Sequence, residues 1–256
     1  MVGAASVEQI RRLEQLTLST APALAETTID GWRVRASATD TRRANSATCL
    51  DASSVPLVTT IAAIEQWFDA HHQAKVFRMT AQLSTPGMDE LLAARGYQRR
   101  LDTLLMTRSL RDRGDHNPSP VGELEVLSLE AGLALLHTLT QLEVTKAAAE
   151  LRRQQRWQGA QRLLALRLNG ELAAIGLGRI EDGYLGVFSM YSVLPQRRHG
   201  HASRILAALA HWGAGRGAHT AFLQVDVQNK PALALYQQAG FVAAYSYWHR
   251  ILETSY

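Results

Sequence analysis

Residues 193–205 run Val193-Leu-Pro-Gln-Arg-Arg-His-Gly-His-Ala-Ser-Arg-Ile205, and they lie between a predicted strand and a predicted helix of the 256-residue chain. Gly200 and the small residues after it leave backbone N–H groups uncovered at the start of the helix, where the helix dipole adds partial positive charge. Arg197, Arg198 and Arg204 add full charges, and Ser203 adds a hydroxyl. This turn predicts an anion site suited to a pyrophosphate. Spacing alone leaves open an ordinary strand-to-helix turn with surface arginines.

Around this turn, apolar periodicity predicts alternating strands and helices. Asn169-Gly170 gives the strongest short hairpin signal. The pattern predicts strands at 123–126, 163–168, 172–180, 184–193, 221–225 and 245–251, and helices at 129–142, 147–157, 200–216 and 230–239. This order indicates a mixed α/β layered domain.

The first part of the chain gives weaker signals of the same kind. They predict strands at 32–35 and 76–80 and helices at 6–19, 58–71 and 89–95. The segment 91–97, Leu-Leu-Ala-Ala-Arg-Gly-Tyr, matches 235–241, Leu-Tyr-Gln-Gln-Ala-Gly-Phe, at an offset of 144 residues. Between the two copies, residues 111–122 contain two prolines and two glycines without apolar periodicity, as a linker does. We therefore expect two tandem domains, 1–110 and 123–256, joined by the linker 111–122.

Composition excludes several classes of protein. Apolar residues make up 46% and charged residues 20%, near the globular average, so long disorder is not expected. The single cysteine, Cys49, allows no intrachain disulfide, and neither a membrane-spanning apolar run nor a signal peptide is predicted. A cytoplasmic protein is the default expectation. A net charge of +4 is too small to indicate nucleic-acid binding by itself.

Two motifs resemble the GNAT superfamily of acetyl-CoA-dependent N-acetyltransferases. Arg197-x-x-Gly200-x-Ala202 matches its Arg/Gln-x-x-Gly-x-Gly/Ala signature, and the segment from Asn229 through Tyr236 to Gly240-Phe241 resembles its second motif. Pro195 stands two residues before Arg197, where three is usual, so a shorter turn is expected. The resemblance covers residues 123–256. It implies an α+β layered fold of two tandem GNAT-like domains, each a mixed, mostly antiparallel sheet flanked by helices.

The resemblance also implies where the cosubstrate acetyl-CoA would bind. We expect no metal, because His199 and His201 have no third ligand nearby in the sequence. The pantetheine arm would lie along the strand 184–193, in the V-shaped opening between that strand and the parallel strand 221–225. The pyrophosphate would lie on the turn, and Asn229 would face the arm. The implied cofactor-binding residues are Met190, Tyr191, Ser192, Val193, Arg198, His199, Gly200, His201, Ala202, Ser203 and Asn229.

The charges that develop during acetyl transfer define the groups that such a site requires. An amine attacks the thioester carbonyl, and a backbone N–H of the splayed strand can stabilise the negative charge that develops on oxygen. The leaving thiolate needs a proton, which the phenol of Tyr236 can supply as general acid. The base that deprotonates the attacking ammonium stays open among Glu143, Asp226, Tyr191 and a water chain.

The first half lacks these features. Residues 52–59, which the offset places opposite the phosphate turn, contain no glycine, and Leu92 stands opposite Tyr236. The segment Asp30-Gly-Trp-Arg-Val-Arg together with Thr41-Arg-Arg-Ala-Asn-Ser46 resembles the N-terminal half of tandem GNAT proteins, which is typically a degenerate copy. The resemblance implies a non-catalytic first domain that replaces a partner subunit, and hence a monomer with an internal pseudo-dimer.

Two other classes of function remain at this point. The second domain could be a sensor that binds acyl-CoA and transfers nothing, although a sensor has no need of an acid at Tyr236. A nucleic-acid-binding function would have only five adjacent arginine pairs in its favour, at 11–12, 42–43, 99–100, 152–153 and 197–198. Such binding would weaken steeply with salt. The acceptor, a small-molecule or peptide amine, cannot be identified from the sequence, and no nucleic-acid or membrane partner is expected.

Overall fold

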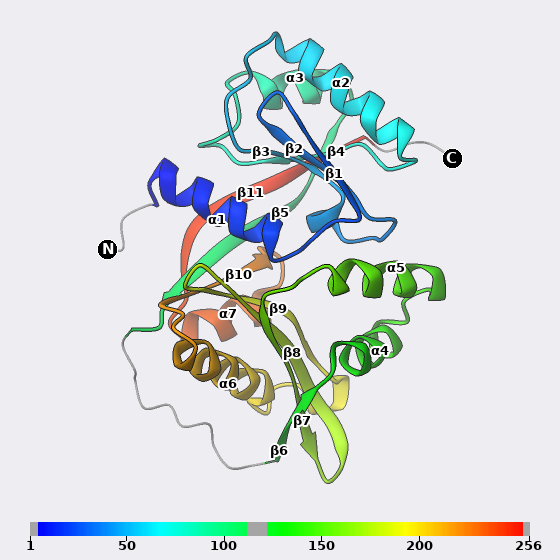
Figure 1. The fold of residues 1–256 in the computed structure, drawn as a ribbon. Helices are drawn as coiled ribbons and strands as arrows, with labels where there is room; N and C mark the ends of the chain where they lie inside the picture. Colours follow the sequence, from blue (N-terminus) through cyan, green and yellow to red (C-terminus); the bar gives the residue numbers. More distant parts are fainter. Residues whose placement is uncertain (1–4, 112–121, 253–256) are drawn as a thin grey trace. The chain divides into compact units, whose positions relative to one another are not determined.

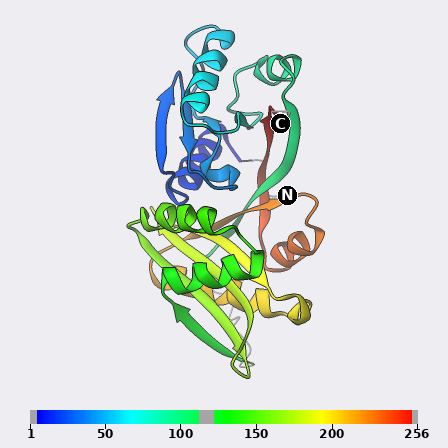
Figure 2. The ribbon, with the colours of Figure 1, turned by 90° about the vertical axis from the view of Figure 1, so that its right-hand side faces the viewer.

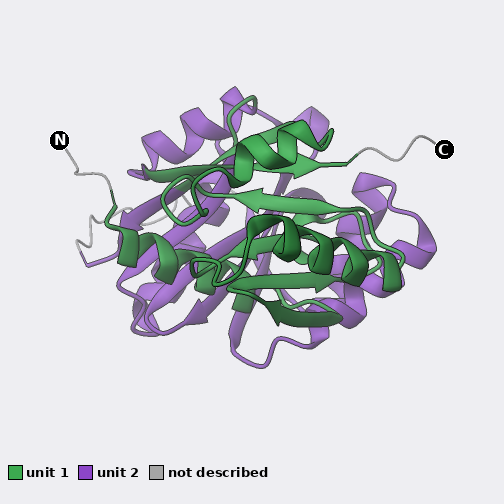
Figure 3. Cartoon of the chain, turned by 90° about the horizontal axis from the view of Figure 1, so that it is seen from above, with its two compact units in different colours: residues 1–105, 226–228, 244–256 green, residues 106–225, 229–243 purple. Residues whose placement is uncertain are grey.

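The computed structural model describes residues 5–111 and 122–252, so the predicted linker lies outside the described residues except at Arg111 and Gly122. The described chain divides into two compact units (Figure 3). Unit 1 contains 5–105, 226–228 and 244–252, and unit 2 contains 106–111, 122–225 and 229–243. This division assigns residues 226–228 and 244–252 to unit 1, whereas the boundary expected from sequence groups them with the rest of 123–256.

Unit 2 is a mixed, mostly antiparallel sheet with helices on both faces (Figure 1). Its strand order is β10-β9-β8-β7-β6, and β9 and β10 run parallel. Its elements are β6 (Glu123–Leu127), α4 (Leu129–Thr140), α5 (Val144–Gln155), β7 (Ala160–Leu168), β8 (Glu171–Glu181), β9 (Tyr184–Ser192), the 3-10 turn η2 (Leu194–Gln196), α6 (His201–Gly215), β10 (Thr220–Asp226) and α7 (Lys230–Gln238). Asn169 and Gly170 both have positive φ in the β7–β8 turn, as the hairpin signal predicted.

Glycines on β8 let α6 pack closely against this sheet. A Cβ on Gly176 would lie 2.7 Å from Ile205 of α6, and one on Gly178 would lie 3.1 Å from Leu209. A Cβ on Gly132 of α4 would meet Leu163 of β7. Leu163 pairs with Leu177, which lies between Gly176 and Gly178 on β8. Because successive strand residues point to opposite faces, α4 and α6 cover opposite faces of the sheet (Figure 2).

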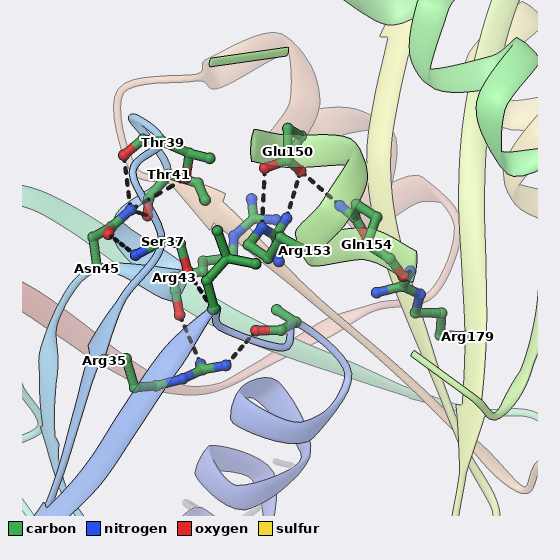
Figure 4. A network of polar contacts seen from close by, with 12 residues as sticks. Arg35, Ser37, Thr39, Thr41, Arg43, Asn45, Glu150, Arg153, Gln154 and Arg179 are labelled. Carbon is green, nitrogen blue, oxygen red and sulfur yellow. Dashed lines mark hydrogen bonds and ion pairs between the residues drawn. The ribbon is translucent and has the colours of Figure 1, made fainter. Parts of the chain in front are cut away.

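A buried polar network joins α5 to the sheet within unit 2 (Figure 4). Arg179 of β8 is 1% exposed and donates to the carbonyl of Gln154 at 3.2 Å and to Oε1 of Gln161 at 3.0 Å. Burial and the positive charge of Arg153 lower the pKa of Arg179 to about 9. Arg153 in turn pairs with Glu150. These bonds fix the C-terminal turn of α5 on β7 and β8.

Unit 1 repeats the mixed sheet with the order β1-β2-β3-β4-β11-β5, in which β3 and β4 run parallel. Its elements are α1 (Val7–Ser19), β1 (Ala25–Ile29), β2 (Trp32–Ala36), the 3-10 turn η1 (Arg42–Ala44), β3 (Ala47–Cys49), α2 (Leu57–Ala70), β4 (Val76–Met79) and α3 (Met88–Ala94). The capping box of Ser6 and Gln9 starts α1, as predicted. The apolar core includes Trp32, Ile61, Phe68 and Phe77.

Two long strands contribute to both units. Strand β5 (Gln98–Ser109) begins in unit 1, and its last residues lie in unit 2; β11 (Val242–Ile251) begins in unit 2 and continues in unit 1. In unit 1, β11 pairs antiparallel with β4 from Trp248–Met79 to Ile251–Val76. In unit 2, the residue after β5, Leu110, donates to the carbonyl of His219 at 2.9 Å. Neither unit is therefore a continuous segment of sequence.

The internal repeat has the same helix ending in both units. In unit 1, Tyr97 N donates to Leu92 O at 3.0 Å around Gly96, whose φ is +88°. In unit 2, Phe241 N donates to Tyr236 O at 2.9 Å around a glycine with φ +82°. Each is a Schellman ending, in which a left-handed glycine lets the chain return hydrogen bonds to the last turn. The resemblance of 91–97 to 235–241 is therefore also a resemblance of backbone geometry.

The motif residues of the first half order a loop. Asn45 accepts from Ser37 N at 2.7 Å and donates to the carbonyls of Thr39 at 2.7 Å and Thr41 at 3.0 Å (Figure 4). Arg35, which is fully buried, donates to the carbonyl of Arg43 at 2.9 Å. These residues hold η1 against the β2–β3 hairpin, so their role in unit 1 is structural.

The predicted helices and strands all occur, with ends shifted by a few residues. Strands β1, β3 and β5 were not predicted. Across the described ranges 5–111 and 122–252, no helix is both long enough and apolar enough to span a membrane.

Candidate active site

The parallel strands β9 and β10 of unit 2 open into a V. They pair from Tyr184–Thr220 to Gly186–Phe222, and the pairing ends there although both strands continue. Phe188 and Phe222 pack edge-to-face at the last pair, over Gly186, with ring centroids 6.1 Å apart. Main-chain groups of β9 beyond residue 186 are therefore not used by β10. The sequence expectation of an opening between two parallel strands is confirmed.

A β-bulge in β9 accompanies the opening. On β8, Ile175 pairs with Tyr191 and Leu177 pairs with Phe188, so Ser189 and Met190 together stand opposite one residue. Ser189 has φ +51°, the left-handed conformation that a bulge often requires. The extra residue bends β9 and interrupts the alternation of its side chains.

The turn after β9 leads to the start of α6. The chain leaves β9 through the 3-10 turn η2, which contains Pro195, and Arg198 follows with φ +68°. Gly200 precedes α6 with φ +80°, and a Cβ there would meet nothing within 4 Å. The N-cap residue of α6 is Gly200, which has no side chain to cap the helix. The first N–H groups of α6 are therefore available to an anion.

Positive charge surrounds this helix start. Arg197 and Arg198 are exposed, and Arg197 Nε donates to the carbonyl of Ser192 at 3.2 Å. Burial and the positive charges of His199 and Arg204 lower the pKa of His201. Arg204, expected to add its charge to the anion site, donates to the carbonyl of Gly122 at 2.8 Å, and its charge still acts on His201. Its side chain helps to hold the N-terminal end of β6.

Helix α7 forms the other wall. Asn229 caps it, accepting a hydrogen bond from Ala232 N at 3.2 Å, and this cap does not use the side-chain NH₂ of Asn229. Spacings of three and four residues predict from the sequence that the stripe Ala232, Leu235 and Ala239 faces the sheet. In the structure these residues are half-buried, and Tyr236 is the buried residue of α7, at 7% exposure. The Tyr236 ring packs against Phe241, with centroids 6.1 Å apart.

These elements surround a pocket of about 680 Å³. All the predicted site residues line it except Val193, whose N–H donates to Ala173 O, and His199, which is exposed and stacks on His201. The lining residues that the sequence did not indicate are Gln196, Pro231, Ala232, Ala234, Leu235 and Gln238. Positions 231, 234, 235 and 238 follow helical spacing, which is the signal that could have identified this face of α7.

The candidate bases differ in position. Tyr191 lines the pocket, with Arg197 5.9 Å above its ring. Glu143 is exposed and accepts a hydrogen bond from Thr145 at 2.6 Å, and Asp226 accepts one from Gln228 N at 2.7 Å. Among the candidates, the pocket therefore brings only Tyr191 together with Tyr236.

Unit 1 has a different turn at the start of α2. Residues 50–56 all have negative φ, and Asp30 places its carboxylate at this turn. Asp30 accepts hydrogen bonds from Ser54 N and Ser54 Oγ, both at 2.7 Å, and from Thr60 Oγ1 at 2.6 Å. The carboxylate of Asp30 thus accepts the hydrogen bonds at the turn of unit 1 that corresponds to the phosphate turn of unit 2.

The residues described contain no group of three or more His, Cys, Asp or Glu side chains placed to hold a metal ion. The pocket presents backbone N–H groups, arginines, one histidine and two tyrosines.

Comparison with known proteins identifies the family. The family described as "Probable histone acetyltransferase Rv0428c C-terminal" matches residues 7–250. The chain belongs to this family. The curated protein "Uncharacterized N-acetyltransferase YobR" of Bacillus subtilis is 24% identical to the chain, over 96% of the chain and 99% of that protein.

Solved structures agree on the fold. A GCN5-related N-acetyltransferase from Kribbella flavida superposes with a TM-score of 0.72 at 14% identity, covering 99% of this chain and 98% of its own. A tandem GNAT protein from the clavulanic acid biosynthesis pathway gives a TM-score of 0.59 at 14% identity, covering 100% and 92%. The GNAT fold class and the assignment of an acyltransferase are confirmed for this member of the Rv0428c C-terminal family.

Proposed function

We propose that unit 2 transfers an acetyl group from acetyl-CoA to a primary amine, with Tyr236 as general acid. The observation that carries the proposal is the end of β9–β10 pairing at Gly186–Phe222, beside an uncapped α6. A cofactor arm can add to the open edge of β9 as a strand would. Its diphosphate can bind at the start of α6, which the helix dipole makes positive.

The residues present suit this donor. Gly200 has no side chain to fill the anion site, and nothing lies within 4 Å of the position of its Cβ. Arg197 and Arg198 line the same pocket and supply charge. Asn229 keeps its side-chain NH₂ for the amides of the arm. The volume of about 680 Å³ lies in the range of cofactor-sized pockets.

The chain's own residues divide the work of the reaction. The backbone N–H groups at the bulge of β9 stabilise the negative charge that develops on the thioester oxygen. Tyr236 donates its hydroxyl proton to the sulfur as the bond to carbon breaks. A water takes the proton of the attacking amine, either directly or through Tyr191, which gives its own hydroxyl proton to the water as it accepts the proton of the amine. Acetyl-CoA supplies the acetyl group, and a free thiol and an acetylated amine leave.

We propose that the enzyme acts as a monomer in the cytoplasm on a small-molecule or peptide amine, without nucleic acid or membrane. The internal repeat supplies a second GNAT-like sheet within one chain, which supports the internal pseudo-dimer and a division at 111–122 into a non-catalytic first domain and a catalytic second one. The single thiol, Cys49, is buried, and burial raises its pKa to about 12, so it is no nucleophile at neutral pH.

The alternative is a sensor that binds acyl-CoA without transfer. A panel of amines, including amino acids, polyamines, aminoglycosides and peptides with free N-termini, separates the two. The assay measures free thiol released from acetyl-CoA and the mass of the acceptor. Enzymatic transfer adds 42 Da, about the mass of an acetyl group less one hydrogen, to at least one amine. Binding of acetyl-CoA without release of free thiol in the presence of any of these amines would support the sensor.

A further inference from the structure

The thioether of Met190 lies in the space above Gly176. A Cβ built on Gly176 would come within 2.5 Å of Met190 Sδ and 2.7 Å of Ile205 Cγ2, closer than real Cβ atoms approach. The glycine therefore makes room for the methionine between β8 and α6. Leu209 Cδ1 lies 3.5 Å from the same position, so the space is apolar.

Met190 also lines the pocket, and the bulge puts it there. Ser189 and Met190 share one partner position on β8, so the bulge changes the direction of the chain at these residues. Met190 thus has one side toward the pocket and its sulfur in the apolar space over Gly176.

The position of Met190 along the opening determines what it would meet. The anion site lies after β9, at the start of α6, and the opening closes at Gly186–Phe222. A ligand anchored at the anion site and extended along β9 passes residue 192 first and reaches the bulge next. Its reactive end therefore lies toward the closed end, beside Met190.

We propose that Met190 sets the acyl-chain length that the enzyme accepts. This proposal rests on the proposed function and adds a specificity to it. An acyl chain longer than acetyl extends into the space that the Met190 side chain fills, because the neighbouring walls are Gly176, Ile205 and the β8 backbone. Truncation at Met190 joins that apolar space to the pocket, and an alkyl chain can then bury its methylenes there.

The test compares acetyl-CoA with butyryl-CoA on the full chain. Calorimetric titration gives the affinity for each donor, and thiol release in the presence of an acceptor gives the rate. Discrimination by one methylene in an apolar pocket is about 10- to 200-fold. We expect wild type to prefer acetyl-CoA by at least about tenfold. Met190→Ala should reverse or abolish that preference, while Met190→Phe should strengthen it.

Met106→Ala is the matched control. Met106 is buried, at 1% exposure, in the part of β5 that belongs to unit 2, and it does not line the pocket. Met106→Ala removes the same side-chain atoms as Met190→Ala, but away from the pocket, so the variant should keep the donor preference of wild type. The two Met190 variants change the preference in opposite directions, so one of them suffices if the other does not fold.

The outcomes separate the two proposals. If both Met190 variants bind the two donors with the wild-type ratio, Met190 does not set the chain length, and the proposed function stands. If wild type binds neither donor, the proposed function itself fails, and this inference fails with it.

Discussion

Phe241 N donates to the carbonyl oxygen of Tyr236 at 2.9 Å, and the two rings pack with an interplanar angle of 61°. The backbone bond and the ring contact together form the Schellman ending of α7. The ending therefore fixes the ring of Tyr236 at the wall of the pocket. Unit 1 has the same backbone bond from Tyr97 N to Leu92 O, but the residue in the place of Tyr236 is Leu92, which has no hydroxyl.

Tyr236→Phe should separate catalysis from packing. Phenylalanine keeps the ring contact with Phe241 and removes only the hydroxyl. We expect turnover of the acceptor to fall about 10²-fold, the low end for a lost general acid, with acetyl-CoA affinity nearly unchanged. The loss should shrink with acyl donors whose thiolate leaves more easily. Steady-state rates with two such donors measure this, and wild-type turnover by the variant would make Tyr236 a packing residue.

Glu14→Ala should strongly destabilise unit 1. Glu14 is fully buried and pairs with Arg78 at 2.8 Å, and it also accepts from Tyr245 Oη at 2.7 Å. Removal leaves the buried guanidinium of Arg78 without this carboxylate, which costs about 3–5 kcal/mol. Urea unfolding measures the loss.

Glu8→Ala on the same helix is the control for Glu14. Glu8 pairs with Arg11 at 2.8 Å but is 81% exposed, so its loss should cost under about 1 kcal/mol. Equal effects of the two substitutions would contradict the role given to the buried pair.

Asp30→Asn should change the acid side of the stability curve. Hydrogen bonds from Thr60 and then Ser54 hold the pKa of Asp30 well below its ordinary value. The unfolded chain therefore takes up the proton first, and the contribution of Asp30, present above about pH 4, is lost as pH falls. Urea midpoints of unfolding are measured at several values between about pH 3 and pH 7, where carboxyl groups titrate. The midpoint should fall less steeply with decreasing pH for the variant than for wild type.

Asp182→Asn is the control for replacing aspartate by asparagine in a turn. Like Asp30, Asp182 precedes a glycine, and its φ of +48° is close to the +44° of Asp30. Parallel pH profiles for wild type and Asp30→Asn would show that the carboxylate of Asp30 contributes nothing through its charge.

The sequence predicted those parts of the fold that depend on local patterns. The capping box of Ser6 and the Asn169-Gly170 hairpin are determined by neighbouring residues, and both were predicted correctly. Strand β3 has only three residues, too few to show a period. Strand β5 was missed because its first four residues are exposed and Leu101, at φ +57°, interrupts the alternation.

The site followed the same rule. The phosphate turn is contiguous in sequence, so its residues could be named from 193–205. Which face of α7 meets the pocket depends on packing between elements, and the prediction chose Ala232, Leu235 and Ala239 for burial where the structure buries Tyr236. The hydrogen bonds of Asp30 join residues 24 and 30 positions apart and have no local signal.

The central claim is that the start of α6 binds the diphosphate of acetyl-CoA, and Gly200→Glu tests it against Gly200→Gln. Both side chains strain a residue at φ +80°, and both have space, but only glutamate adds a negative charge. The measurement is calorimetric titration of acetyl-CoA into the folded full-length proteins. We predict one site per chain in wild type, weakened but measurable binding in Gly200→Gln, and no detectable binding in Gly200→Glu. Wild-type affinity in Gly200→Glu, or two equal sites per chain, would contradict the account.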